Sequence, residues 1–342
     1  MGGENFCRVS RGSLGIYSIL KEFCTGDHVV VPWNVCPDVV FAIRAANKIP
    51  YFIDYFSRDE PITSKMLSKI PNYVTCLMHV HIYGAFHNIT ARMRNRFSLI
   101  IDDAAQAIGS YNGDLVAGYN GDFGVFSFGK TKQCDLGGGG LVYAKNLNDA
   151  ILLEKNIAEY SVLSTEQYET IKSHNSNIIK SKLGLFEKNG MIEWLSPNLD
   201  AKEVFKNYDS VLSKEKLVTH LCSYDPAQRI STSLSFSNKV ANLNLECHTY
   251  SPGDNVWRIV VKPVNFDFSI YVRAFKHLRN KGHACSNWYY PANEIFGFKI
   301  NGNPKLTLDD ICRFQFLVEG TSEGFSILNE EKILGIMRKY YV

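Results

Sequence analysis

The 342-residue sequence lacks several features that mark particular classes of protein. It has no run of 18 or more apolar residues, which a membrane-spanning helix requires. The segment Met1–Cys7 has no basic stretch followed by an apolar run, so we expect no signal peptide. The nine cysteines form no CxxC pair, which argues against both a disulfide framework and a zinc site. We therefore expect a cytoplasmic protein without a metal centre.

The charge balance also excludes one class of partner. The formal net charge is only +3, and 21% of the residues are charged. A nucleic-acid-binding surface needs clustered Lys and Arg, which this sequence does not show, so we expect no nucleic-acid partner. With 45% hydrophobic residues, the chain is long enough for a large domain and a smaller one.

Short apolar runs alternate with helical patterns in the first half of the chain. We expect helices near residues 14–23 and 39–46, and strands near 29–32, 51–54, 74–78, 98–101, 124–127 and 141–144. Such alternation is typical of an α/β domain with a mostly parallel sheet covered by helices on both faces.

The pattern changes in the second half of the chain. After a mainly helical stretch near residues 148–216, we expect a strand at 256–261, a helix near 270–282 and a terminal helix near 333–337. Residues 1–225 are therefore predicted to form the large α/β domain, and residues 226–342 a smaller α+β domain.

The first segment that carries chemistry is an apolar strand that runs into Asp102 and Asp103. Carboxylates at the C-terminal end of a parallel strand lie where open α/β sheets bind ligands. Such a carboxylate can pair with a protonated heterocyclic nitrogen. The alternative is that one of the two aspartates only caps a following helix.

The second segment is Phe126–Gly140, which contains Ser127, Lys132 and a run of four glycines. Burial lowers the pKa of a lysine and makes its amine nucleophilic, so Lys132 can form a Schiff base with an aldehyde. The Ser127 hydroxyl can donate a hydrogen bond to a phosphate. The alternative is an ordinary surface loop, and the glycines do not match a P-loop.

The third segment, Arg11-Gly12-Ser13, opens the first helical pattern. Backbone N–H groups at a helix N-terminus, next to a small residue and a hydroxyl, form an anion site. Gly12 and Ser13 are therefore candidates for a phosphate cradle, although they could also be a helix cap without a ligand.

In this order the three segments resemble the DegT/DnrJ/EryC1/StrS family of sugar aminotransferases, typified by perosamine synthases. The family's Ser-Gly-Thr helix start stands at Arg11–Ser13, and its Val-His-Leu-Tyr-Gly stretch stands at Val80–Gly84. Its Glu-Asp-Ala-Ala-Gln run corresponds to Asp102–Gln106. The family's Ser-Phe pair, Thr-Lys and glycine-rich end follow within Ser127–Gly140. The resemblance covers about residues 9 to 146.

The resemblance implies a fold-type I enzyme that depends on pyridoxal 5'-phosphate. Lys132 would be the Schiff-base lysine, Asp103 the partner of the pyridine nitrogen and Gln106 a contact of the ring hydroxyl. Gly12, Ser13 and Ser127 would bind the phosphate. A residue within 33–36 would stack on the ring; we assign Trp33, with a core role as the alternative.

The resemblance also implies a substrate and an assembly. Tyr83 would face the substrate, as would Trp288 and Tyr289, for which packing between the domains is the alternative. The substrates would be a keto-deoxysugar, linked to a nucleotide, and an amino-acid donor such as glutamate. The enzyme would serve surface polysaccharide (lipopolysaccharide O-antigen) or amino-sugar biosynthesis as a homodimer.

Three departures from the family pattern leave other functions open. The family's N-terminal arm before the phosphate-binding helix has no counterpart, and Gly138 replaces a usual acidic residue. The family's Gly-Tyr-Asn-Tyr-Arg segment, whose Asn reaches the neighbouring subunit's cofactor, has only a poor match at Glu187–Met191. One alternative is a degenerate homologue that binds cofactor or sugar nucleotide in a structural or regulatory role. A sugar 3-dehydratase is the other, but that branch has His where this chain has Lys132.

Overall fold

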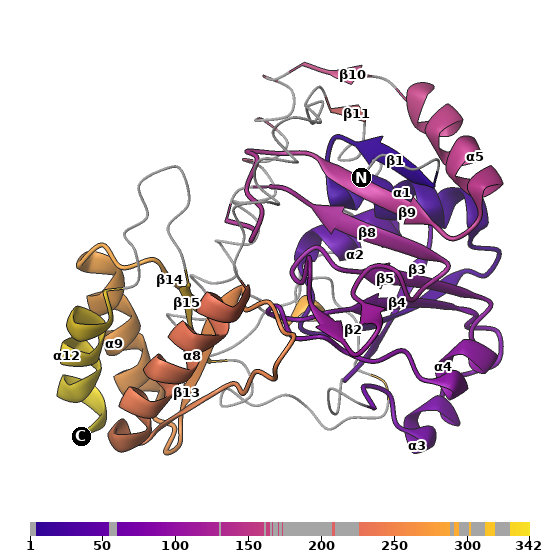
Figure 1. The fold of residues 1–342 in the computed structure, drawn as a ribbon. Helices are drawn as coiled ribbons and strands as arrows, with labels where there is room; N and C mark the ends of the chain where they lie inside the picture. The colour runs from indigo at the N-terminus through magenta and orange to yellow at the C-terminus, as the bar shows by residue number, and fades with distance from the viewer. Residues whose placement is uncertain are drawn as a thin grey trace.

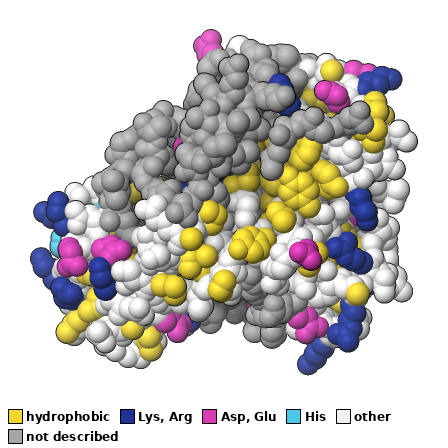
Figure 2. All heavy atoms as spheres, viewed as in Figure 1, with side chains coloured by type: hydrophobic (Ala, Val, Ile, Leu, Met, Phe, Trp, Pro, Cys, Tyr) yellow, Lys and Arg dark blue, Asp and Glu magenta, His cyan; other side chains and the backbone are white. Residues whose placement is uncertain are grey.

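Two lobes of different size make up the protein (Figure 1). The computed structural model describes residues 5–54, 60–129, 131–160, 162–164, 166, 170, 173, 207–208, 226–287, 291–293, 301, 312–318 and 329–342. Among the helices within these ranges, none combines the length and the apolar character that crossing a membrane demands. On the face shown in Figure 2, side chains of both charge signs are interspersed around the two lobes.

A seven-stranded sheet forms the centre of the larger lobe, with the strand order β1-β9-β8-β5-β4-β2-β3. Only β9 runs antiparallel to its neighbours in this sheet. The strands are β1 (Phe6–Val9), β2 (His28–Pro32), β3 (Ile49–Ile53), β4 (Cys76–Val80), β5 (Leu99–Asp103), β8 (Phe123–Ser127) and β9 (Gly140–Ala144). The predicted α/β fold with a mostly parallel sheet is therefore confirmed.

Alternate residues of the central strands enter two different cores. Val29 and Val31 of β2 pack in the same cluster as helices α1 and α2, whereas Val30 packs on the opposite face. This follows from the period of two in a strand, which sends successive side chains to opposite faces. The helices of this lobe are α1 (Gly12–Phe23), α2 (Pro37–Ala45), α3 (Ser64–Leu67), α4 (Ala91–Arg96) and α5 (Leu147–Ala158).

The smaller lobe is built on a four-stranded antiparallel sheet with the order β12-β13-β15-β14. Its elements are α8 (Pro226–Val240), η2 (Ala241–Leu243), β12 (Leu245–Cys247), β13 (Arg258–Pro263), α9 (Phe268–Asn280), β14 (Cys285–Ser286), β15 (Phe314–Leu317) and α12 (Glu330–Tyr341). Gly282 follows the end of α9: it has a φ of +80°, and the N–H of the next residue, His283, donates to Leu278 O at 3.1 Å. The predicted domain boundary between residues 225 and 226 borders a stretch outside the described residues and stays a prediction.

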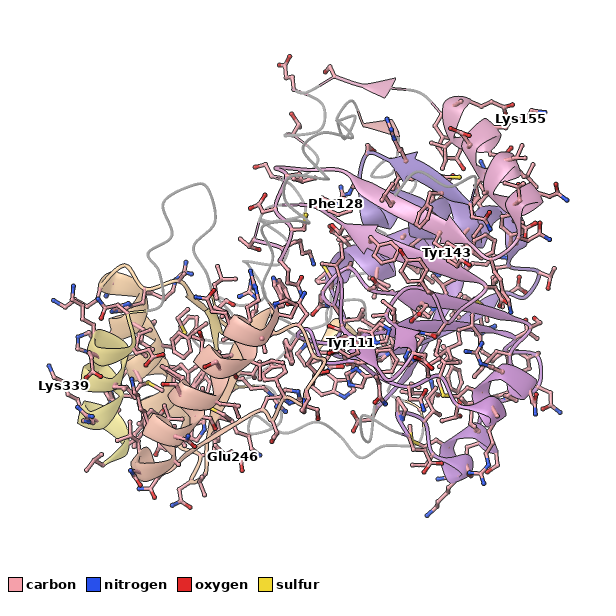
Figure 3. All side chains as sticks on the ribbon, viewed as in Figure 1. Tyr111, Phe128, Tyr143, Lys155, Glu246 and Lys339 are labelled. Atoms are coloured by element: carbon pink, nitrogen blue, oxygen red, sulfur yellow. The ribbon has the colours of Figure 1, made fainter. Side chains whose placement is uncertain are left out.

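The remaining elements are short pairs of strands. They are β6 (Tyr111–Asn112) with β7 (Leu115–Val116), and β10 (Val162–Leu163) with β11 (Asn207–Tyr208). Figure 3 shows Tyr111 between the two lobes, where its N–H donates to Gly253 O at 2.8 Å.

The lobes meet at a turn that ends the Val80–Gly84 motif. Gly84 has a φ of +96°, and a Cβ there would lie 1.9 Å from Asn255 O, so only glycine lets the two backbones approach. Asn255 N donates to Gly84 O at 3.0 Å, and Trp257 N donates to Tyr83 O at 2.9 Å. Through these bonds, the segment that contains Asn255 and Trp257 contacts the large lobe directly.

Candidate functional site

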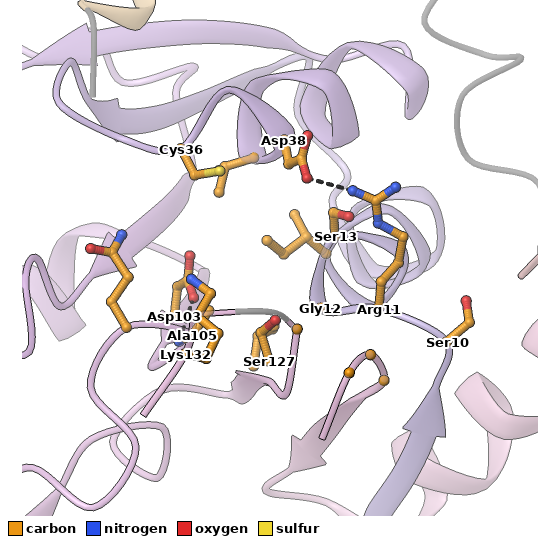
Figure 4. A pocket seen from close by; sticks show the side chains of 18 residues that line it. Ser10, Arg11, Gly12, Ser13, Cys36, Asp38, Asp103, Ala105, Ser127 and Lys132 are labelled. Atoms are coloured by element: carbon orange, nitrogen blue, oxygen red, sulfur yellow. Dashed lines mark hydrogen bonds and ion pairs between the residues drawn. The ribbon is translucent and has the colours of Figure 1, made fainter. Parts of the chain in front are cut away.

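A cavity of about 520 Å³ opens where α1 and α2 begin and where β5 and β8 end. It is lined by Ser10, Arg11, Gly12, Ser13, Ile16, Cys36, Asp38, Val39, Asp103, Ala105, Gln106, Val125, Ser127, Gly129, Lys132 and residues 137–139. Its size is within the range of small-molecule sites, about 300–1,000 Å³. All three chemistry-bearing segments of the sequence contribute to this one cavity (Figure 4).

The start of α1 forms one end of the cavity. A Cβ on Gly12 would be 3.4 Å from both Phe126 O and the Ser127 Cβ, so a small residue lets the helix approach the end of β8. Ser13 is 8% exposed and lines the cavity, as does the half-buried Ser127. Within the described part of the chain, neither hydroxyl has a hydrogen-bond partner. Two open hydroxyls beside the N–H groups of a helix N-terminus fit an anion such as a phosphate.

An ion pair lies beside this anion end. Arg11, the residue before α1, donates to the Asp38 carboxylate in the first turn of α2, and both side chains line the cavity. Figure 4 shows this pair bridging the two helix starts above Ser13. The sequence motif contained Arg11, but nothing in the sequence indicated Asp38 as its partner.

The other end of the cavity holds Asp103. The strand β5 extends through both aspartates, so Asp102 and Asp103 point to opposite faces of the sheet. Asp103 is 2% exposed, lines the cavity and accepts one hydrogen bond, from Ala105 N at 2.9 Å. Burial raises its pKa, while Ala105 N and Lys132 act in the opposite direction. No helix follows β5 directly, so Asp103 caps a turn and not a helix.

Asp102 belongs to a closed polar network on the other face. Its Oδ1 bonds to His81 Nε2 at 2.8 Å, and its Oδ2 accepts from the N–H groups of Gly118 and Asn120, both at 2.9 Å. Burial opposes ionisation, but the charge and hydrogen bonds of its neighbours lower its pKa overall.

His79, His81 and Asp102 are of types that can ligate a metal, and their ligand atoms lie within 4.8 Å of one another. Hydrogen bonds already engage them: His81 Nδ1 accepts from His87 N, and His79 Nε2 bonds to His87 O, both at 2.9 Å. We interpret the group as structural.

Lys132 lies next to Asp103 in the cavity lining (Figure 4). It belongs to the loop after β8, and its own N–H donates to Gly129 O at 3.2 Å. Burial lowers the pKa of its amine, and Asp103 and Asp38 act in the opposite direction. A lowered pKa favours the neutral form of the amine, and this is the form that attacks an aldehyde.

Gln106 and Tyr83 are joined to each other. The Gln106 Oε1 accepts from Tyr83 N at 3.0 Å, and Gln106 lines the cavity. Tyr83 is buried outside the cavity lining, where its hydroxyl accepts from Gln315 Nε2 at 3.2 Å. Gln106 is predicted to contact the cofactor ring, and Tyr83 is predicted to contact the substrate. Both contacts stay predictions.

The residue predicted to stack on the ring lies elsewhere. Trp33 is buried in the main core outside the cavity lining, and its indole N–H donates to Asp54 at 2.9 Å. This position agrees with the alternative that Trp33 is a core residue. Cys36, in the same four-residue segment, lines the cavity across from Lys132 (Figure 4). Trp288 and Tyr289, the other predicted substrate contacts, lie outside the described residues, as does Glu187–Met191.

Two residues that sequence analysis placed only in a strand approach the lysine. The Trp257 ring centre lies 4.6 Å from Lys132 Nζ and 4.3 Å from the Arg258 guanidinium carbon. Both residues are buried. The charged Arg258 inside the apolar run 256–261 was the one feature of the sequence that could have indicated a functional role here.

The donor set matches the cofactor expected from the sequence. A protonated pyridine nitrogen needs a buried carboxylate, an aldehyde needs a nucleophilic amine, and a phosphate needs clustered donors. The cavity has Asp103, Lys132 and the α1 start with Ser13 and Ser127 at corresponding places. Pyridoxal phosphate therefore fits the residues present.

Comparison with known proteins points to the same class. The model of the DegT/DnrJ/EryC1/StrS aminotransferase family matches residues 2–180. The GDP-perosamine synthase of Escherichia coli O157:H7 is 27% identical over 220 residues, which cover 61% of this chain and 60% of that protein. A UDP-N-acetyl-3-dehydro-alpha-D-glucosamine 3-aminotransferase of Acidithiobacillus ferrooxidans is 30% identical over 126 residues, or 35% of this chain and 34% of that protein. The chain thus spans less than two thirds of these curated relatives.

Solved structures share the fold over nearly the whole chain. The aminotransferase TlmJ of Streptoalloteichus hindustanus superposes with a TM-score of 0.69 at 17% sequence identity, covering 99% of this chain and 86% of the other. At this identity the likeness concerns the fold, and it confirms the predicted aminotransferase architecture.

Proposed function

The chain belongs to the DegT/DnrJ/EryC1/StrS aminotransferase family, and on that premise we propose that it is a pyridoxal-phosphate-dependent aminotransferase acting on a keto-deoxysugar. The observation that carries this proposal is the shared cavity. Lys132 and Asp103 line one end, and the N-terminus of α1 with two serine hydroxyls lines the other. These groups suit a ligand that carries both a basic ring and a phosphate.

Each of these side chains has a defined task. Pyridoxal phosphate supplies an aldehyde and a ring that accepts electrons from the reacting carbon. Lys132 would hold the cofactor through its aldehyde group, and the amine of Lys132 would move a proton at the reacting carbon of the substrate. Asp103 keeps a proton on the ring nitrogen, because a buried carboxylate is stabilised by a facing positive charge. Ser13 and Ser127 donate to the phosphate.

The substrate is proposed as a nucleotide-linked keto-sugar, with glutamate as the amino donor. The relatives support this class, since both are named for nucleotide-sugar chemistry. The homodimer and the role in amino-sugar or surface polysaccharide biosynthesis belong to the same proposal. Lys132 favours amination over the dehydratase alternative, whose lysine position is a histidine.

Absorbance spectroscopy and mass spectrometry test the proposal. Protein loaded with pyridoxal phosphate should absorb in the visible range, and L-glutamate should shift that band to the amine form. Borohydride should trap the cofactor on Lys132, and Lys132→Ala should abolish trapping while Lys145→Ala, an exposed lysine, retains it. Loading without any response to amino donors would support the degenerate homologue instead.

A panel of keto-sugar nucleotides then tests the acceptor. Amination, detected by the mass of the product, is the expected outcome. Loss of water without gain of an amino group would identify a dehydratase.

A further inference from the structure

The segment 254–257 of the C-terminal half is wedged between two loops of the large lobe. Asp254 Oδ1 accepts from Phe86 N at 2.8 Å on one side. On the other side, Gln133 Nε2 donates to Asn255 O at 3.1 Å, next to the lysine in sequence. This segment therefore contacts the lysine loop across more than 100 residues of chain, as the 122-residue separation of that bond shows.

Trp257 contacts the loop at its strained point. Thr131 has a φ of +70°, which is unfavourable for a β-branched residue and persists only when neighbours hold it. The indole N–H of Trp257 donates to Thr131 O at 2.6 Å. The indole is itself fixed, because Trp257 is 3% exposed and its backbone N–H bonds to Tyr83 O. A rigid side chain thus holds the residue that precedes Lys132.

The same ring faces two cations. Lys132 Nζ lies 4.6 Å from the ring centre and the Arg258 guanidinium carbon 4.3 Å from it, both within cation–π range. Arg258 is buried, and one of its Nη atoms donates to Ser286 Oγ, which keeps the guanidinium in place. A second positive charge near the amine disfavours its protonated form.

We propose that Trp257 and Arg258 are positioning residues for Lys132: the indole holds the strained Thr131 turn and packs against the amine, and the guanidinium places a second positive charge on the same ring. The inference rests on the proposed function of Lys132. It makes the C-terminal segment, and not the large lobe alone, responsible for the lysine's reactivity. In agreement with this, burial is the main cause that lowers the pKa of Lys132 and Arg258 adds to it, while Cys36, Asp103 and Asp38 act in the opposite direction.

The rate at which apo protein bonds pyridoxal phosphate, followed by absorbance across a pH series, tests the role of Trp257. Trp257→Phe keeps the ring and loses the N–H, so we expect the rate to fall about tenfold, the effect of one hydrogen bond. Trp257→Leu loses both and should react more slowly still. Trp33→Phe is the matched control, since it also removes one indole hydrogen bond from a buried ring outside the cavity. Its rate should equal that of the wild type.

The pH midpoint of the same rate tests Arg258. Arg258→Met should move the midpoint upward, because a neighbouring positive charge is lost and the amine holds its proton more tightly. Arg258→Lys keeps the charge and should keep the midpoint. A purely structural arginine would change the stability of both variants and leave the midpoint in place.

The outcomes separate this inference from the proposed function. If the wild type does not bond the cofactor at Lys132, the proposed function fails. If it does, and the Trp257 variants react like Trp33→Phe or Arg258→Met keeps the wild-type midpoint, only the positioning role is overturned.

Discussion

Asp102 and Asp103 are adjacent on β5, yet the two faces of the sheet treat them differently. The face of Asp102 is closed: three hydrogen bonds, from His81 and two backbone N–H groups, satisfy its carboxylate. On the face of Asp103 there is one hydrogen bond and then a cavity. A buried carboxylate whose oxygens all accept hydrogen bonds stabilises the fold. A buried carboxylate with few hydrogen-bond donors around it is a candidate for binding a ligand. The comparison predicts that equal changes on the two faces have different consequences.

The largest expected effect is on catalysis, at Asp103. Asp103→Asn cannot hold a proton on the ring nitrogen, so we expect the amination rate to fall about 10²- to 10³-fold, as for other preorganised electrostatic partners. The turn should persist, because the Asn carbonyl still accepts from Ala105 N. Single-turnover kinetics with glutamate measures the loss. A variant as active as the wild type would remove Asp103 from the site.

The next effect is on stability, at Asp102. Asp102→Asn replaces one of the two acceptor oxygens of a fully buried, paired carboxylate, and we expect a loss of about 3 kcal/mol in the free energy of unfolding. Urea unfolding of the cofactor-free protein measures it. Since neighbouring groups lower the pKa of Asp102, its contribution is present above the unfolded-state pKa and is lost as pH falls through the folded-state value. Equal stability of Asp102→Asn and wild type would contradict the closed network.

How far the sequence predicts this arrangement depends on the range of the interaction. Apolar runs indicated the parallel strands, because alternation along a strand is a local pattern. They did not show that β5 continues through both aspartates, which decides the face that each one occupies. The choice of Asp103 came from resemblance to a family, since the residue types at 102 and 103 are identical.

Long-range contacts were beyond the sequence. The Trp257 bond to Thr131 joins residues 126 apart, and no local pattern encodes such a pairing. Trp33 illustrates the same limit: its position near a predicted ring site suggested stacking, but its bond to Asp54 turns it into the core. Cys36, three residues later, is the residue that precedes α2, and it lines the cavity.

A pair of buried serines repeats the comparison at a smaller scale. Ser110 donates to Gly84 O at 2.8 Å and accepts from Asn255 N at 2.9 Å, whereas Ser13 has no partner among the described residues. Ser110→Ala removes both of these hydrogen bonds and should cost about 1–2 kcal/mol of stability, although Asn255 N still donates to Gly84 O. Ser13→Ala should leave stability unchanged.

For cofactor binding we expect the opposite order: the substitution of Ser13 has the effect, and the substitution of Ser110 has none. Ser13→Ala should weaken pyridoxal phosphate binding about ten- to a hundredfold, the value of one hydrogen bond to a charged group, and spare pyridoxal, which has no phosphate. Ser110→Ala should bind both ligands as the wild type does. Equal losses of pyridoxal and pyridoxal phosphate binding in Ser13→Ala would contradict a phosphate contact.

The smallest expected effect is a gain in the stability of the cofactor-free protein on substitution of Asp103, whereas substitutions in a core usually lower stability. Because burial raises the pKa of Asp103, the folded cofactor-free protein binds its proton more tightly than the unfolded chain does. Stability therefore falls as pH rises from the unfolded-state pKa through the folded-state value, and the ionised carboxylate is a liability at neutral pH. Asp103→Asn should then be more stable than the wild type at pH 7, because the neutral amide avoids the cost of burying a charge. The gain should vanish below about pH 4, where both side chains are neutral, and unfolding curves of the two proteins at pH 7 and pH 4 measure it. A variant that is less stable at pH 7 would mean that Asp103 already has its partners, as Asp102 does.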